Sequence, residues 1–178
     1  MILSAQATYL AKSLDLEGVK DLYKQRVKML VVVDSDEPQD VPAMRKVMAE
    51  FPSPIVLCGK EIGEALPFPG ASIEKDFGWA PAHPVVDAYH AFRDGVYDFP
   101  SYDLVAALYA VHPDKGFFKL SDAAGKVRSL IFDPSQKDAI IQAFVSTASA
   151  KPVAPQQRFR PPAAADGKAA PPVKTPDK

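Results

Sequence analysis

One acidic residue stands at the start of an apolar helical pattern, directly behind a proline turn. The stretch runs Phe-Pro-Ser-Tyr-Asp from Phe99 to Asp103, and apolar residues then recur at helical spacing through Leu104, Leu108 and Val111. This spacing places Asp103 in the first helical turn, close to backbone N–H groups that have no partner within the helix. Two interpretations follow. Asp103 either complements the helix dipole behind an N-capping Ser101, or it presents a carboxylate to a binding site.

A second set of acids follows the most apolar segment of the chain. Residues 27–33 include the run Met-Leu-Val-Val-Val and predict a buried strand, which ends at Asp34 and Asp36. A helix is predicted over residues 40–51, and a second apolar strand at residues 55–58 is followed by Glu61. A strand, a helix and a strand in this order form a parallel β-α-β unit. We therefore expect these acids at one edge of a sheet, where α/β proteins bind their ligands.

The rest of the chain predicts further elements around this unit. Residues 84–92 have a helical pattern, and residues 117–132 predict a hairpin. A last helix is expected behind an N-capping Asp133, with Ile140, Ile141, Phe144, Val145 and Ala148 turned inward. The predicted fold class is α/β, with a mostly parallel sheet, helices on both faces and a small hairpin. We assign residues 1–150 to this domain and expect the Pro- and Ala-rich residues 151–178 to be a disordered tail.

Two buried parallel strands need neighbours, because parallel sheets are wide and covered by helices. The pattern reveals no further parallel strands beside residues 27–33 and 55–58. We therefore expect the chain to be the later part of a larger α/β domain.

Composition excludes several classes of protein. The chain has 178 residues, 47% of them hydrophobic and 24% charged, as in soluble globular proteins. Its only cysteine, Cys58, lies in an apolar run, which excludes a disulfide framework and a zinc module and predicts a buried thiol. The net charge is −1, but residues 151–178 carry six Lys or Arg and two Asp. We interpret this basic tail as solvated and expect no nucleic-acid or membrane partner. No segment predicts a membrane span or an export signal, so a cytoplasmic location is expected.

Four segments, taken in order, resemble a known family. They are Asp-Ser-Asp-Glu-Pro-Gln-Asp-Val-Pro-Ala from Asp34, Pro-Ile-Val-Leu-Cys-Gly-Lys-Glu-Ile-Gly from Pro54, His-Pro-Val-Val-Asp-Ala-Tyr from His83, and Pro-Ser-Tyr-Asp-Leu from Pro100. Their succession resembles the C-terminal half of the inosine-uridine-preferring nucleoside hydrolases, over about residues 8 to 150.

The resemblance implies an activity and a cofactor. Members of the family cleave the N-glycosidic bond of a ribonucleoside with water, using a calcium ion held by aspartates that also bind the ribose. An early Asp-x-Asp-x-x-x-Asp-Asp loop supplies most of those ligands, and a late aspartate completes them. The resemblance puts Asp103 at the late position, as a metal ligand. Because the early loop is missing from these segments, we expect this chain alone to be inactive and to have no tight calcium site.

The resemblance also implies residues that contact the sugar, with departures from the family pattern. The family has Glu-x-Asn after the strand that corresponds to residues 27–33, where this chain has Asp34 and Asp36. An aspartate in place of asparagine removes hydrogen-bond donors and adds charge. Tyr102 replaces the family's His or Trp, and Glu61 lies at the same expected edge. The substrate-binding candidates are therefore Asp34, Asp36, Tyr102 and Glu61, and the expected ligand is a ribonucleoside.

Three alternatives stay open. In the first, the chain is a non-catalytic remnant or binding module of the same fold, completed by another chain or by a second copy of itself. Asp34, Asp36 and Asp40 also have the outline of the early metal loop, although position 41 is Val rather than Asp. Tyr89 and His90 either reach a ligand from their helix or belong to a solvated or half-buried face.

Overall fold

The computed structural model describes residues 1–34, 38–122 and 125–152. The strands are β1 (Ile2–Leu3), β2 (Leu30–Val33), β3 (Ile55–Cys58), β4 (Phe118–Leu120) and β5 (Val127–Phe132). The α-helices are α1 (Thr8–Ser13), α2 (Val19–Arg26), α3 (Val41–Glu50), α4 (Lys60–Ala65), α5 (Gly70–Asp76), α6 (Pro84–Phe92), α7 (Tyr102–Val111) and α8 (Lys137–Ala148). Two 3-10 turns, η1 (Pro38–Asp40) and η2 (Pro134–Gln136), precede α3 and α8.

These strands form one mixed sheet in the order β1-β2-β3-β5-β4. The pairs β1–β2, β2–β3 and β3–β5 are parallel, and β4–β5 is antiparallel. The predicted β-α-β unit of β2, α3 and β3 is therefore confirmed, as is the hairpin of β4 and β5.

The expectation that β2 and β3 lack neighbours in this chain is wrong. β1 flanks β2, and β5 flanks β3. One strand serves two partners, because the first half of β5 pairs with β3 from Val127 to Ser129 and the second half pairs with β4 from Leu130 to Phe132. The hairpin thus widens the parallel sheet instead of standing apart from it.

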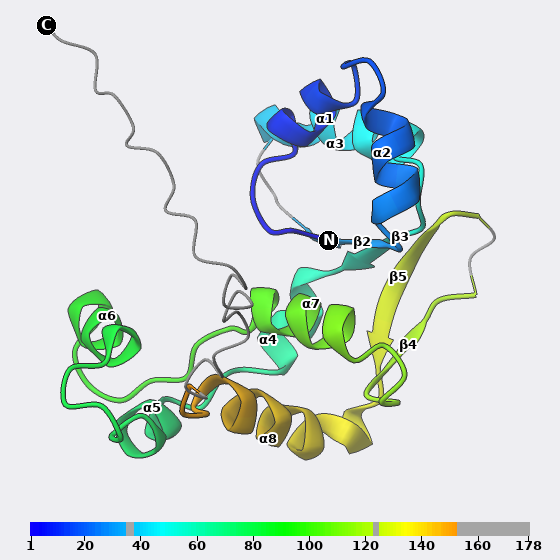
Figure 1. Ribbon diagram of the computed structural model, residues 1–178. Helices are drawn as coiled ribbons and strands as arrows, with labels where there is room; N and C mark the ends of the chain where they lie inside the picture. The colour runs from blue at the N-terminus through cyan, green and yellow to red at the C-terminus, as the bar shows by residue number, and fades with distance from the viewer. Residues whose placement is uncertain (35–37, 123–124, 153–178) are drawn as a thin grey trace, which may run out of the picture.

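Helices cover both faces of the sheet (Figure 1). Alternate residues of β2 point to opposite sides, as the two-residue period of a strand requires. Leu30 and Val32 pack on one face against Leu10 of α1, Val47 of α3 and Phe51, which follows α3. We call this group the α1/α3 cluster. Val31 packs on the other face in a larger group that includes Cys58, Val105, Leu108, Ile140 and Phe144, which we call the α7/α8 cluster.

The inward side of α8 follows the predicted pattern. Ile140 and Phe144 are almost fully buried, as expected, whereas Ala148 is exposed. Asp133 caps the turn before the helix, because its side chain accepts hydrogen bonds from the Ser135 backbone N–H and hydroxyl at 2.9 and 2.8 Å. These bonds lower the pKa of the Asp133 carboxyl.

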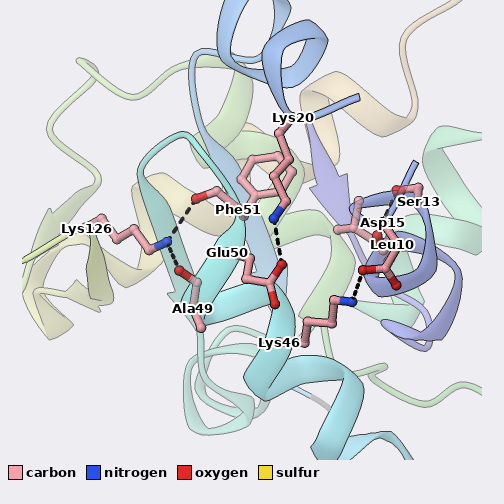
Figure 2. A network of polar contacts seen from close by, with 9 residues as sticks. All are labelled: Leu10, Ser13, Asp15, Lys20, Lys46, Ala49, Glu50, Phe51 and Lys126. Carbon is pink, nitrogen blue, oxygen red and sulfur yellow. Dashed lines mark hydrogen bonds and ion pairs between the residues drawn. The ribbon is translucent and has the colours of Figure 1, made fainter. Parts of the chain in front are cut away.

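Polar contacts gather around the C-terminal end of α3 (Figure 2). Lys126, just before β5, donates through Nζ to the carbonyl oxygens of Ala49 at 2.6 Å and Phe51 at 3.0 Å. Lys20 pairs with Glu50 at 2.7 Å, and Lys46 pairs with Asp15. The last helical carbonyls of α3 are thereby satisfied by a cation from the neighbouring strand.

Candidate functional site

The carboxyl ends of β2 and β3 meet the start of α7. The Asp34 backbone N–H, directly after β2, donates to the carbonyl of Cys58, the last residue of β3, at 3.0 Å. The Cys58 thiol lies 4.0 Å from the carbonyl oxygen of Tyr102, the first residue of α7. Segments more than forty residues apart in the sequence therefore meet at one edge of the sheet.

Close packing of α4 against α7 fixes this meeting point. The Ser101 backbone N–H donates to the Gly63 carbonyl at 2.9 Å. A Cβ on Gly63 would lie 2.9 Å from both the backbone nitrogen and the Cα of Tyr102, so only glycine allows this approach. The Tyr102 hydroxyl also lies 3.5 Å from a carboxylate oxygen of Glu64.

The charges of this edge act on the Cys58 thiol. Burial, together with the smaller effect of the negative charges of Glu61 and Asp103, raises the pKa of Cys58 to about 12. Both carboxylates thus lie near the end of β3, while Cys58 itself stays a neutral thiol. Its burial is as predicted.

A cavity of about 600 Å³ opens beside the first turn of α7. Tyr102 and Asp103 line it from α7, and Tyr89 and Phe92 line it from α6. Its other lining residues are largely apolar: Phe68, Ile73, Phe77, Val85, Ala88, Tyr97, Phe99, Pro100, Ser101, Leu104 and Ala148. The volume lies within the range of roughly 300 to 1,000 Å³ that is usual for small-ligand sites.

A pair of tyrosines holds the outer wall of the cavity. The Tyr89 hydroxyl donates to the Tyr97 carbonyl at 2.8 Å and accepts from the Tyr97 backbone N–H at 2.6 Å. The Tyr97 hydroxyl in turn donates to the Tyr89 carbonyl at 2.8 Å, and the two rings stack with centroids 4.3 Å apart. These contacts fasten the segment after α6 to the helix. Two backbone hydrogen bonds between Phe68 and Phe99 fasten the same segment to the connection between α4 and α5.

Tyr89 is therefore not on a solvated or half-buried face, since only 6% of its surface is exposed. His90 points elsewhere, with its Nε2 atom 3.4 Å from a carboxylate oxygen of Glu74. His83 caps α6 by accepting the Val85 backbone N–H at 3.2 Å, consistent with a helix boundary.

Ser101 departs from the predicted capping role. It occupies the N-cap position of α7, but its hydroxyl makes no capping hydrogen bond. The residue is only 2% exposed, and within the described part of the chain its Oγ atom has no hydrogen-bond partner. A buried hydroxyl without a partner is unusual, and Ser101 is one of the residues that line the cavity.

The sequence-predicted site residues are only partly brought together. Tyr102 and Asp103 share the cavity, and Asp103 is exposed there. Asp34 and Glu61 are exposed at the sheet edge but do not line the cavity. Glu61 folds back over Gly59, leaving no room for a Cβ at that position. Asp36 lies outside the described residues.

The described carboxylates do not fit a calcium site. Calcium takes six to eight oxygen ligands. Across residues 1–34, 38–122 and 125–152, no three acidic, histidine or cysteine side chains are grouped so that they could hold a metal ion. No chemical step through a metal is therefore derived from these residues.

Asp40 has a structural partner, which argues against the alternative in which Asp34, Asp36 and Asp40 form a metal loop. Its side chain is 3% exposed and accepts the Ala7 backbone N–H at 2.9 Å and the Thr8 hydroxyl at 3.4 Å. The carboxylate therefore holds the start of α1 instead of facing a ligand.

Sequence reasoning missed much of the cavity wall. Tyr97, Phe99 and Ser101 belong to a segment without regular structure, so no periodicity marks their inward side. Phe68 and Phe77 are buried and also line the cavity. The aromatic residues that recur between positions 89 and 102 are the feature of the sequence that could have indicated this wall.

The fold and this site together define an α/β protein whose aromatic cavity, with the exposed carboxylate of Asp103, lies near the carboxyl ends of the parallel strands β2 and β3. Comparisons with protein-family models, with curated proteins and with solved structures found no match. No helix in the described segments is both long and apolar enough to cross a bilayer.

Proposed function

We propose that this chain is a nucleoside-hydrolase-like protein that binds a ribonucleoside in the cavity beside α7. The sugar would lie at Asp103 and Tyr102, and the base would lie among the aromatic side chains. One observation carries the proposal: a single cavity combines an exposed carboxylate with an aromatic wall. Aromatic rings stack favourably on a base, and a carboxylate accepts hydrogen bonds from sugar hydroxyls.

The resemblance to the nucleoside hydrolases supports the same assignment from the sequence. Cleavage of an N-glycosidic bond places positive charge on the sugar in the transition state, which a nearby carboxylate stabilises. Asp103 is suited to that role and to the ribose hydroxyls. Calcium-assisted hydrolysis, as in the family, would require carboxylates in addition to those that the structure describes.

A second candidate is a non-catalytic binding module of the same fold. The observation that favours it is the lack of a metal-binding group among the described side chains. The two candidates differ in turnover: both bind a ribonucleoside, but only a hydrolase releases the free base.

Asp103→Asn tests the proposal, with Asp138→Asn as its matched control. Both substitutions remove an acid from the first turn of a helix, α7 or α8, so each loses a dipole interaction of about 0.3–1 kcal/mol. Only Asp103 lines the cavity. We expect calorimetry with inosine and with uridine to give about tenfold weaker binding for Asp103→Asn and unchanged binding for Asp138→Asn.

Equal affinities for the two variants would leave Asp103 with only a helix-dipole role and would contradict the proposal. Release of free base, measured with and without added calcium, would exclude the binding module and would also contradict the expected inactivity of this chain alone. We expect no release and no tight calcium binding by this chain alone. Calcium binding in the micromolar range would show that the ligand set is more complete than we propose.

A further inference from the structure

Among the described residues, the Ser101 hydroxyl is a buried polar group that has no hydrogen-bond partner. A buried hydroxyl without a hydrogen bond is costly, and it gains from any ligand that supplies one. Ser101 offers both a donor and an acceptor, so either kind of ligand atom satisfies it. It lines the cavity two residues before Asp103.

The surroundings of Ser101 restrict the ligand that can reach it. Phe68, Phe77 and Phe99 contribute aromatic surface to the same cavity, and Tyr97 adds a ring stacked on Tyr89. Such walls favour a flat ring over a flexible or highly charged group. The ligand must therefore combine a planar ring with a polar atom on its edge.

We propose that Ser101 is a specificity-determining residue that hydrogen-bonds the polar edge of a planar heteroaromatic ring held in this cavity. The cavity then selects nitrogen- and oxygen-bearing rings over purely hydrocarbon rings. This inference rests on the proposed function, because the ring that Ser101 contacts would be the base of the bound ribonucleoside. It extends to free bases, which carry no sugar for Asp103 to bind.

Calorimetry with three probes tests the assignment: inosine, the free base hypoxanthine, and toluene as an apolar ring. In Ser101→Ala we expect affinity for inosine and hypoxanthine to fall about tenfold, which corresponds to about 1.4 kcal/mol. Toluene should bind the variant as well as the wild type or more tightly, because the cavity wall becomes apolar.

Ser53→Ala is the matched control. Ser53 is also buried, but its hydroxyl donates to the Val27 carbonyl at 2.6 Å and it does not line the cavity. We expect Ser53→Ala to lower Tm and to leave all three affinities unchanged. Ser101→Ala, which removes a hydroxyl without a partner, should keep or raise Tm.

The outcomes separate this inference from the proposed function. Hypoxanthine binding that depends on Ser101, without inosine binding, would support the inference and overturn the ribonucleoside assignment. Inosine binding unaffected by Ser101→Ala would overturn the inference and leave the assignment standing. Absence of binding by both polar probes, or equal losses for toluene and hypoxanthine, would overturn the inference. So would a Tm loss in Ser101→Ala as large as that in Ser53→Ala.

Discussion

Two aspartates at helix starts have different surroundings in this protein. Asp40 precedes α3 and is buried, with its carboxylate turned toward the start of α1. Asp103 lies in the first turn of α7 and is exposed at the cavity. The difference arises from packing: α1 and α3 lie against each other over one face of the sheet (Figure 1), whereas the start of α7 borders the cavity.

Replacing Asp40 by Ala should destabilise the fold. The Ala7 backbone N–H would lose its acceptor in a buried position, which costs about 1–3 kcal/mol. Urea unfolding measures the loss, and Asp21→Ala provides the control, because Asp21 is an exposed acid in the first turn of α2. The structural role of Asp40 is contradicted if both variants unfold at the same urea concentration.

The sequence alone distinguishes these aspartates poorly. Helical spacing locates both correctly at helix starts, but the bond from Asp40 to Ala7 spans 33 positions in the chain. Local patterns carry no information on such a partner. The same limit applies to Ser101, whose type predicts an N-cap while the surrounding contacts leave its hydroxyl unbonded.

Among the elements, the end of α3 and the start of β5 are linked through the side chain of Lys126. Lys126 reaches two carbonyl oxygens at the end of α3, as Figure 2 shows. A cation at a helix C-terminus is favoured both by the helix dipole and by the carbonyls that lack helical partners. The contact also sets the start of β5, because the Lys126 carbonyl accepts the Ile55 backbone N–H at 2.7 Å.

Lys126→Met should therefore weaken the junction of α3 and β5. The substitution keeps most of the side-chain length and removes the charged donor, so we expect a loss of about 1 kcal/mol in the free energy of unfolding. Lys115→Met is the control, since Lys115 is exposed in the turn after α7 and lies outside the network of Figure 2. Chemical denaturation at low and high salt should give a larger loss at low salt. Equal losses for the two variants would contradict the proposed cap.

Element types were more predictable than element partners. The apolar runs at residues 30–33 and 55–58 identified two parallel strands, and Pro84 marked the start of α6. β1 has only two residues, too few for a periodic signal, and β5 was recognised only as part of a hairpin. Its second pairing, with β3, depends on where the chain returns after α7, which local spacing does not encode.

At the scale of the whole molecule, the two hydrophobic clusters share one sheet. Leu30 and Val32 contribute to the α1/α3 cluster, and Val31 between them contributes to the α7/α8 cluster. Loss of β2 from the sheet would therefore expose buried side chains of both clusters. We therefore expect the described domain to unfold as one cooperative unit.

Val47→Ala and Val105→Ala test this coupling. Both valines are fully buried, Val47 in the α1/α3 cluster and Val105 in the α7/α8 cluster, and each truncation should cost about 2 kcal/mol. Trp79, the one tryptophan of the chain, bonds through its indole N–H to the Ser149 carbonyl at 2.9 Å and reports on the α8 side by fluorescence. Both variants should shift the fluorescence and circular-dichroism transitions by the same amount. If Val47→Ala left the unfolding transition measured by Trp79 fluorescence unchanged, the two clusters would be independent folding units.

The linked tyrosines of α6 have a consequence for strongly alkaline solution. Removal from water raises the pKa of Tyr97, and the neighbouring Tyr89 raises it further. The folded protein then holds the Tyr97 proton more firmly than the unfolded chain, so this contribution to stability is complete below the ordinary tyrosine pKa and disappears as the pH rises through the elevated one. Ionised Tyr97 can no longer donate to the Tyr89 carbonyl. At strongly alkaline pH the loop after α6 should therefore detach from the helix, which would open the aromatic wall of the cavity to solvent.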